Sequence, residues 1–386
     1  MKLNDIFPNN SLSVSDVDKL VYSRDASEFE GQCQAVVWPK KAEEVQNLVH
    51  YVKRTQNIIT IRGAGLSKSG GCIPANSIVA DMSKMDQIVN IDVDHVIVEA
   101  GVILDDLNKA LALKKKFFPI IPVEHSNCTI GGMVSTNTLG LNTYYKRMED
   151  WVIGLQVIDG TGRDMNLGAV PSKAFIGSEG TMGVVCKIKL KILKKPIEKT
   201  VSIFKFNTLG ALMDKLKVLK QQENILEITY YDEFCSKSIE LGELMHLVVE
   251  FSNDEGLIQD PDEIKNLDEM KEKLQHILIK KRYSNREDPV LPLENMAQFL
   301  YWLRKNDIPC FGYMKNGILN CCFRDYSKLP QEMQDLVERF NGRKHSILPI
   351  GLKRKKYLKK EEAEKLVIFK NQYDNMKVLN RGVLID

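Results

Sequence analysis

The stretch that decides the fold is Ile58–Gly71, which reads IITIRGAGLSKSGG. Its β-branched beginning is typical of a short buried strand, and this strand runs directly into a turn that holds four glycines. Glycine lets the backbone adopt positive φ and approach a ligand closely, and the successive N–H groups of such a turn form a concave anion site. Arg62 adds a fixed positive charge beside it. The stretch therefore predicts a phosphate-binding loop, with a plain tight turn as the alternative.

Two common phosphate motifs do not fit this loop. A Walker A loop ends in Gly-Lys-Ser/Thr, whereas this one ends in Gly70-Gly71-Cys72. A dinucleotide fingerprint needs a helix that begins at the glycines, but here Pro74 and a strand-like run at 77–82 follow. The loop is therefore expected to bind phosphates without the help of a helix dipole.

The composition is that of a soluble globular protein large enough for two domains. The chain has 386 residues, of which 44% are hydrophobic and 27% charged. Its net charge of only +3, with lysine and glutamate mixed along the chain, argues against a nucleic-acid surface. The basic run Leu352–Lys360 is the local exception, and we expect a solvated helix start there, with a membrane-surface or partner patch as the alternative.

Cysteine spacing and hydropathy indicate the compartment. The eight cysteines show no C-x-x-C spacing, which argues against an iron–sulfur cluster within this chain and favours reduced thiols. No apolar stretch reaches the roughly 18 residues of a membrane span, and the start MKLNDIFPNN lacks a signal-peptide core. We therefore expect a cytoplasmic protein, with docking to a membrane-associated partner at the membrane periphery as an added expectation.

Periodicity places the glycine loop in a strand–helix–strand unit. Apolar residues fall on one face of a predicted helix at 41–54, between a strand at 35–38 and the loop's own strand. A second segment, 129–140, is a track of small residues rich in hydrogen-bond donors, which suits a flat ligand but also suits tight packing of helix against sheet. A hairpin is predicted around Asp159–Gly162. A second glycine turn at 177–183 precedes a strictly alternating, half-exposed strand that ends near Leu193.

The chain changes character after residue 196, where Lys194–Pro196 marks an exit from the first domain. Strands and helices then alternate, with helices predicted at 209–221, 264–280, 293–304 and 329–340, and strands at 309–313 and 317–323. A last helix is predicted at 360–371.

Three motifs, in this order and spacing, carry a family resemblance: RGAGLSKSGG at 62–71, TIGGMVSTNTLG at 129–140 and FIGSEGTMGVV at 175–185. The chain resembles flavin-linked oxidases of the vanillyl-alcohol oxidase type, which have a PCMH-type FAD-binding domain. Within them it is most similar to the branch of D-2-hydroxyacid dehydrogenases and glycolate oxidase FAD subunits. The resemblance is strong over 20–195, and DPVLPLENM at 288–296 and VLNRGVLI at 378–385 extend it weakly to the rest of the chain.

The resemblance implies an α+β fold: a two-subdomain FAD-binding domain at 1–196, an α+β cap domain with an antiparallel sheet at 197–341, and a segment at 342–386 that returns to the FAD domain. It also implies FAD held non-covalently, because no histidine lies in the glycine loop. The residues that would hold FAD by position are Arg62, Gly63, Ala64, Gly65, Leu66, Ser67, Gly70 and Gly71 at the pyrophosphate, Gly131, Gly132, Ser135, Thr136, Asn137 and Gly140 at the flavin and ribityl chain, and Glu179, Gly180 and Val185 at the adenosine end.

The chain departs from the family at the metal site. Family members bind a metal through two histidines of a Gly-His-x-Gly-Asp-Gly-Asn-x-His motif and a later Glu-His-Gly. Here Tyr313 and Asn320 stand in place of the two histidines, and Ile347-Leu348 in place of Glu-His. Because a phenol, an amide and two alkyl groups are poor ligands for a divalent ion, we expect no metal site. Tyr313 and Asn320 become the candidate catalytic residues, with core packing as the alternative for Tyr313.

The resemblance implies an FAD-dependent dehydrogenase or oxidase acting on a small 2-hydroxyacid or related alcohol such as D-lactate or glycolate. Such an enzyme passes electrons to an acceptor protein or a quinone. Without a metal, a basic side chain must hold the substrate carboxylate, and the positional candidates are Arg282, Arg286 and Lys315. Two alternatives remain: a flavin-carrying or degenerate accessory subunit in a hetero-oligomer with an iron–sulfur subunit, and a non-enzymatic protein that has lost flavin. No nucleic-acid partner is expected.

Overall fold

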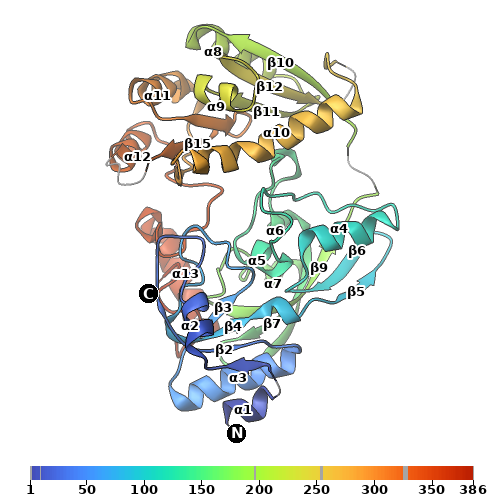
Figure 1. Ribbon diagram of the computed structural model, residues 1–386, viewed down its shortest axis with the longest axis vertical. Coiled ribbons are helices and arrows are strands. Elements are labelled where there is room, and N and C mark those ends of the chain that lie inside the picture. The colour runs from blue at the N-terminus through green and yellow to red at the C-terminus, as the bar shows by residue number, and fades with distance from the viewer. Residues whose placement is uncertain (1, 9, 195–196, 253–254, 325–328, 386) are drawn as a thin grey trace. The chain divides into compact units, whose positions relative to one another are not determined.

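The computed structural model describes residues 2–8, 10–194, 197–252, 255–324 and 329–385. The chain divides into two compact units (Figure 1). Unit 1 comprises Met1–Leu141, Tyr145–Pro196 and Leu348–Asp386, and unit 2 comprises Asn142–Tyr144 and Ile197–Ile347. At the predicted exit from the first domain, Lys195 and Pro196 lie outside the described residues.

The first sheet of unit 1 carries the glycine loop. Its strand order is β1-β2-β4-β3, in which β2, β4 and β3 run parallel and β1 is antiparallel to β2. The predicted helix at 41–54 is found as α3, whose buried face packs on the sheet through Val45, Leu48 and Val52. The elements are α1 (Leu3–Ile6), β1 (Leu12–Ser13), α2 (Asp16–Tyr22), β2 (Gln32–Val37), α3 (Ala42–Thr55), β3 (Ile59–Arg62) and β4 (Ala75–Asp81).

The second sheet of unit 1 is antiparallel, in the order β5-β6-β9-β7-β8. The predicted hairpin at Asp159–Gly162 is confirmed by the β7–β8 pair. The elements are β5 (Ile88–Ile91), β6 (His95–Glu99), α4 (Leu104–Ala112), α5 (Ile130–Ser135), α6 (Met148–Trp151), β7 (Val152–Asp159), β8 (Asp164–Gly168), α7 (Ala169–Ser172) and β9 (Gly183–Lys191).

Strand β9 differs from its predicted half-exposed pattern. Its first four residues are all buried, and alternation begins only after Cys186. The reason is that Val184 and Cys186 pack into the core of the first sheet, whereas Val185 packs into the core of the second. The strand is therefore covered on both faces where the two sheets of unit 1 meet.

Unit 2 is built on a third antiparallel sheet, with the order β10-β12-β11-β14-β15-β13. Helices α8, α11 and α12 pack on one face, and α9 and α10 pack on the other. This mixed architecture confirms the predicted α+β class. The elements are β10 (Thr200–Phe206), α8 (Leu209–Leu219), β11 (Ile225–Tyr231), α9 (Glu233–Ser238), β12 (Met245–Phe251), α10 (Pro261–Lys280), β13 (Asn285–Glu287), α11 (Leu293–Lys305), β14 (Cys310–Tyr313), β15 (Ile318–Phe323) and α12 (Leu329–Arg339).

The C-terminal part of the chain, from Leu348 onward, belongs to unit 1. After the short turn η3 (Lys355–Tyr357) and helix α13 (Lys360–Tyr373), the chain reaches the edge of β3. There Ile59 donates its N–H to the carbonyl of Val378 (2.8 Å), and Asn380 donates its own to the carbonyl of Ile59 (2.9 Å). The strand that leads into the glycine loop is thus closed by the last residues of the chain. None of the described helices is both long and apolar enough to cross a membrane.

Candidate functional site

The three glycine-bearing segments, far apart in the sequence, meet in unit 1. Gly63 lies against Thr129, because a Cβ on that glycine would be 2.4 Å from the threonine Oγ1. A Cβ on Gly71 would be 3.3 Å from Oε2 of Glu179. The second and third segments are joined by the N–H of Glu179, which donates to the carbonyl of Ser135 at 2.9 Å. The loop therefore touches both other segments.

The glycine loop presents free backbone donors. Gly65 and Gly70 have φ of 71° and 76°, in the left-handed region that favours glycine. The hydroxyl of Ser67 accepts hydrogen bonds from the N–H groups of Ser69 (3.2 Å) and Gly71 (2.9 Å), so it shapes the turn. The N–H groups at 64–66 have no protein acceptor among the described residues. Unpaired amides around positive-φ glycines fit a diphosphate ligand such as that of FAD.

Arg62 is held in place beside this loop. Its guanidinium donates to the carbonyl of Arg24 (2.6 Å) and lies 5.1 Å from the centre of the Tyr22 ring. It passes so close to Gly65 that a Cβ there would be 2.1 Å from Nη2. The fixed cation therefore sits against the turn, as the sequence predicted, and Gly65 makes room for it.

The second segment contains a short helix that the sequence pattern did not predict. Thr129 caps α5 by accepting a hydrogen bond from the N–H of Gly132 at 3.1 Å. Gly131 packs against Ala100, where a Cβ would be 2.7 Å from the alanine Cβ, and Gly140 packs against the backbone of Ile121 at 2.8 Å. Close packing therefore explains these two glycines, which is the alternative considered for this track. Thr136 is also engaged internally, because its hydroxyl donates to the carbonyl of Gly132 at 3.0 Å.

The third segment places Glu179 in the interior. Its carboxylate accepts hydrogen bonds from the N–H groups of Ile350 (2.8 Å) and Gly351 (2.9 Å). Burial raises the pKa of Glu179 to about 7, although these backbone hydrogen bonds act in the opposite direction. Val185 points into the core of the second sheet. In this structure the Glu179 side chain thus anchors the chain at 350–351, next to the glycine loop.

Sequence reasoning missed two polar residues that support the loop. Arg354, 1% exposed, donates to Oγ of Ser69 at 2.5 Å, although the basic run that contains it was expected to be solvated. Asn380 accepts from the N–H of Ile61 (2.7 Å) and donates to the carbonyl of Glu179 (2.6 Å). The family-like closing segment VLNRGVLI contained Asn380 and was the available signal, whereas nothing in the basic run distinguished Arg354 from its neighbours.

In unit 2, Tyr313 and Asn320 lie on one face of the sheet. Tyr313 pairs with Ile318, and Asn320 with Phe311, across β14 and β15, and residues two apart on a strand share a face. Both side chains are buried, and within the described part of the chain Nδ2 of Asn320 has no hydrogen-bond partner. Burial raises the pKa of Tyr313 to about 12, and the charge of Glu227 acts in the same direction. The phenol is therefore protonated at neutral pH.

The three cationic candidates for a substrate carboxylate are separated by the structure. Lys315 donates to the carbonyl of Ile225 at 2.5 Å. Arg282 follows the end of α10 and is exposed. Arg286 pairs with Cys322 across β13 and β15, which places it on the face of Tyr313 and Asn320. Arg286 is thus the one of the three that shares this face.

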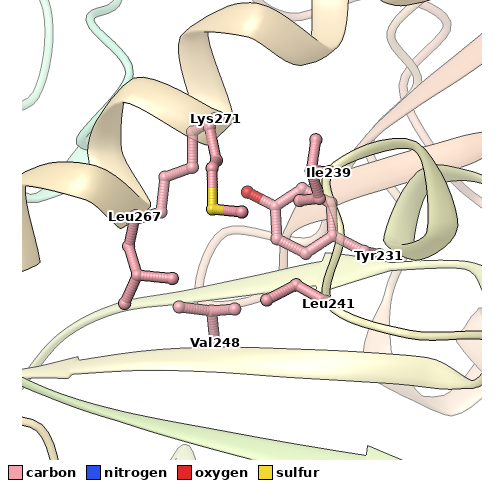
Figure 2. Close-up of a pocket in the computed structure, with 7 residues that line it drawn as sticks. Tyr231, Ile239, Leu241, Val248, Leu267 and Lys271 are labelled. Carbon is pink, nitrogen blue, oxygen red and sulfur yellow. The ribbon is translucent and has the colours of Figure 1, made fainter. Parts of the chain in front are cut away.

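A small pocket in unit 2 lies between α10 and the sheet (Figure 2). Its walls are apolar apart from Tyr231 and Lys271. The ammonium of Lys271 is paired with Glu250 and Asp268, so its charge is already compensated. The pocket is lined by Tyr231, Ile239, Leu241, Val248, Leu267, Met270 and Lys271.

Metal-ligand chemistry is sparse in this chain. Across the described ranges, no group of three or more His, Cys, Asp or Glu side chains is arranged to hold a metal ion. At the position of the family's Glu-His pair, the N–H of Ile347 donates to Asp288, and Leu348 is buried. The residues at this position do not fit a divalent ion.

Sequence comparisons agree with the geometry of unit 1. Residues 33–168 match the family described as FAD binding domain. The chain is 30% identical over 211 residues to "Glycolate oxidase subunit GlcD" of Bacillus subtilis (strain 168), covering 51% of this chain and 45% of that one. It is 27% identical over 256 residues to a D-lactate dehydrogenase of Archaeoglobus fulgidus, covering 63% and 56%.

A D-2-hydroxyglutarate dehydrogenase of Xanthomonas citri pv. viticola is 26% identical over 219 residues, covering 53% of this chain and 46% of the other. The chain thus spans about half the length of the curated relatives it matches. Among solved structures, an alkyldihydroxyacetonephosphate synthase matches with a TM-score of 0.73 at 16% identity, covering 98% of this chain and 83% of that one. At this identity the structural match speaks for the fold alone.

Proposed function

We propose that this protein is an FAD-dependent oxidoreductase that oxidises the CH–OH group of a small 2-hydroxyacid or related alcohol, because residues 33–168 match the family described as FAD binding domain. The observation that carries the proposal is the meeting of the glycine loop with the segments at Thr129 and Glu179. The names of the sequence relatives support the choice of D-lactate or glycolate as test substrates.

In this proposal, FAD binds to the glycine loop of unit 1. The unpaired N–H groups at 64–66 would hold the diphosphate, with the charge of Arg62 beside them. Ser67 would keep the turn in shape, and Arg354 and Glu179 would fix the chain behind it. FAD, when bound, supplies a hydride acceptor.

Unit 2 supplies polar groups for the substrate. Tyr313 would donate its phenolic proton in a hydrogen bond to a substrate oxygen, and Asn320 would contribute an amide donor. With a pKa of about 12, Tyr313 orients the substrate hydroxyl rather than removing its proton at neutral pH. Arg286, on the same face, would hold the carboxylate.

A flavin-carrying accessory subunit is the second candidate. It is favoured by the replacement of the family's metal ligands by Tyr313, Asn320 and Ile347-Leu348, and by the burial of the first two side chains. An accessory subunit would retain FAD and act only with a partner, such as an iron–sulfur subunit. The enzyme of the first proposal would instead pass electrons to an acceptor protein or a quinone. For either candidate we infer a cytoplasmic location, with the basic run at 352–360 as the contact for a membrane periphery.

The test is an anaerobic titration of the FAD-loaded protein with D-lactate and glycolate, followed by bleaching of the flavin absorbance. The enzyme hypothesis expects bleaching without added metal, and Tyr313→Phe should slow it at least about tenfold through the loss of one hydrogen bond to the substrate. Tyr301→Phe is the matched control, because Tyr301 is 64% exposed on α11. Retained FAD with no bleaching by any hydroxyacid would instead support the accessory subunit.

A further inference from the structure

A three-residue segment of the FAD-binding part of the sequence is embedded in unit 2. Asn142–Tyr144 belongs to unit 2, although Leu141 and Tyr145 on either side belong to unit 1. The segment follows Gly140, which by the family resemblance lines the flavin. Whatever holds Asn142–Tyr144 therefore also fixes the chain next to that glycine.

The main hold on this segment is the carboxylate of Glu227 on β11. One of its oxygens accepts hydrogen bonds from both the N–H (3.0 Å) and the hydroxyl of Thr143. The other oxygen accepts from the N–H of Ile228 at 2.9 Å. Asn316 completes the contact by donating to Oγ1 of Thr143 at 2.8 Å. Glu227 is 1% exposed, so these hydrogen bonds are shielded from water.

A second buried carboxylate lies directly across the strand. Glu250 on β12 is the cross-strand partner of Glu227, and it accepts a hydrogen bond from Nδ2 of Asn142 at 3.2 Å. Burial alone would raise its pKa, but Lys271 and Lys199 outweigh burial and lower the pKa to about 2. Glu250 is thus charged at neutral pH and paired with two lysines, whereas among the described residues the donors to Glu227 are the neutral groups of Thr143 and Ile228.

We propose that Glu227 is a positioning residue whose carboxylate holds Thr143 and thereby fixes the chain that follows Gly140. This inference rests on the proposed FAD-dependent function, in which the stretch around Gly140 lines the flavin. A carboxylate is suited to this task, because two acceptor oxygens can bind the threonine N–H, its hydroxyl and the neighbouring strand at once.

The hold should strengthen as Glu227 ionises. Burial raises the pKa of Glu227 to about 7, the hydrogen bonds from Thr143 act to lower it, and the charge of Glu250 acts to raise it. The hydrogen bonds from Thr143 lower the pKa of Glu227 because they stabilise its ionised form. By linkage, protonation of Glu227 must weaken these hydrogen bonds by the same free energy. The titratable and charged groups around this pair, from β12, α10, β14 and the chain before β10, are Glu250, Lys271, Asp268, Tyr313 and Lys199.

Hydrogen exchange of the FAD-loaded full chain tests this inference. After correction for intrinsic exchange rates, protection of the amides at 142–145 should be higher at pH 8 than at pH 6. Glu227→Gln and Thr143→Val should each reduce that protection at least tenfold, and Glu227→Gln should abolish its pH dependence. Asp232→Asn is the matched control, because Asp232 is also buried and burial raises its pKa to about 6. Its carboxylate accepts hydrogen bonds from the backbone N–H groups of Cys235 (2.7 Å) and Cys310 (2.6 Å), and not from Thr143.

Unchanged protection at 142–145 in both Glu227→Gln and Thr143→Val would overturn the inference. So would a pH dependence that persists in Glu227→Gln. Thr143→Val breaks the same pair from the other side, which keeps the test valid if the Glu227 variant does not fold. A wild-type protein that retains FAD but is not reduced by hydroxyacids would refute the proposed reaction, while the exchange readout would stand independently of it.

Discussion

At Gly65 two constraints act on one residue. Its φ of 71° is costly for any side chain, by roughly 1–2 kcal/mol, and a Cβ would collide with the guanidinium of Arg62 at 2.1 Å. Gly65→Ala should therefore displace Arg62 and distort the turn that carries the free N–H groups. We expect at least a tenfold loss of FAD affinity, measured by the ratio of flavin to protein absorbance during titration of the apoprotein.

Gly168→Ala is the control for that substitution. A Cβ on Gly168 would meet nothing within 4 Å, and its φ of −78° suits any residue. It should bind FAD as the wild type does. Equal FAD affinity in Gly65→Ala and wild type would mean that the turn does not contribute to cofactor binding.

At the residue scale, the sequence located the important glycines, but it did not show which structural requirement each of them meets. Gly63 and Gly71 lie where the loop touches the other two segments. Gly131 and Gly140 are instead explained by close packing. Arg354 could not be recognised, because a lysine- and arginine-rich run gives no sign of which member turns inward, and that depends on the distant Ser69. The placement of a side chain by a partner 285 residues away is invisible to local patterns.

At the scale of elements, the edge of β3 depends on the closing segment at 378–380. Asn380→Ala would leave the N–H of Ile61 and the carbonyl of Glu179 without this partner. Asn380 is buried, so water cannot replace the two hydrogen bonds that its side chain makes. We therefore expect the free energy of unfolding, measured by urea denaturation, to fall by about 1–3 kcal/mol.

Asn371→Ala provides the comparison, since Asn371 is exposed on α13 and should change stability by less than about 0.5 kcal/mol. A similar stability for Asn380→Ala and the wild type would show that the closing segment contributes little to this edge.

Elements with a clear apolar period, such as α3, were predictable from sequence within one or two residues. Helix α5 was not, because Gly131-Gly132 has poor intrinsic helix propensity. It forms because Thr129 caps it and its apolar side chains are buried in the second core of unit 1. Similarly, the burial of both faces at the start of β9 follows from the meeting of two sheets, which strand periodicity alone does not reveal.

For the whole molecule, three buried carboxyls dominate the expected pH dependence of stability. Burial raises the pKa of Glu179 and Glu227 to about 7 and that of Asp232 to about 6. The folded state therefore binds more protons than the unfolded state between about pH 4 and 7, so stability should fall as pH rises through this window, by at most roughly 3 kcal/mol for each carboxyl. Thermal unfolding at pH 5 and pH 7.5 measures the decline.

Two other groups oppose this trend. Burial lowers the pKa of His246, so stability rises with pH toward 6.5 through this group. Glu250 has a pKa of about 2, so the stability that it contributes is lost as pH falls from about 4.5 toward 2. The double variant Glu179→Gln, Glu227→Gln should flatten the decline between pH 5 and 7.5. A melting temperature that rises over this range in the wild type would contradict the assignment of neutral buried carboxyls.

The division of the chain also has a consequence for biosynthesis. Residues that brace the cofactor loop, Arg354 and Asn380, are translated after the whole of the inserted 197–347 stretch. On the ribosome, the edge of β3 stays unpaired until residues 378–380 have been translated, which is after the antiparallel sheet of unit 2. A nascent chain arrested before residue 354 would therefore lack both side chains that brace the glycine loop and its strand.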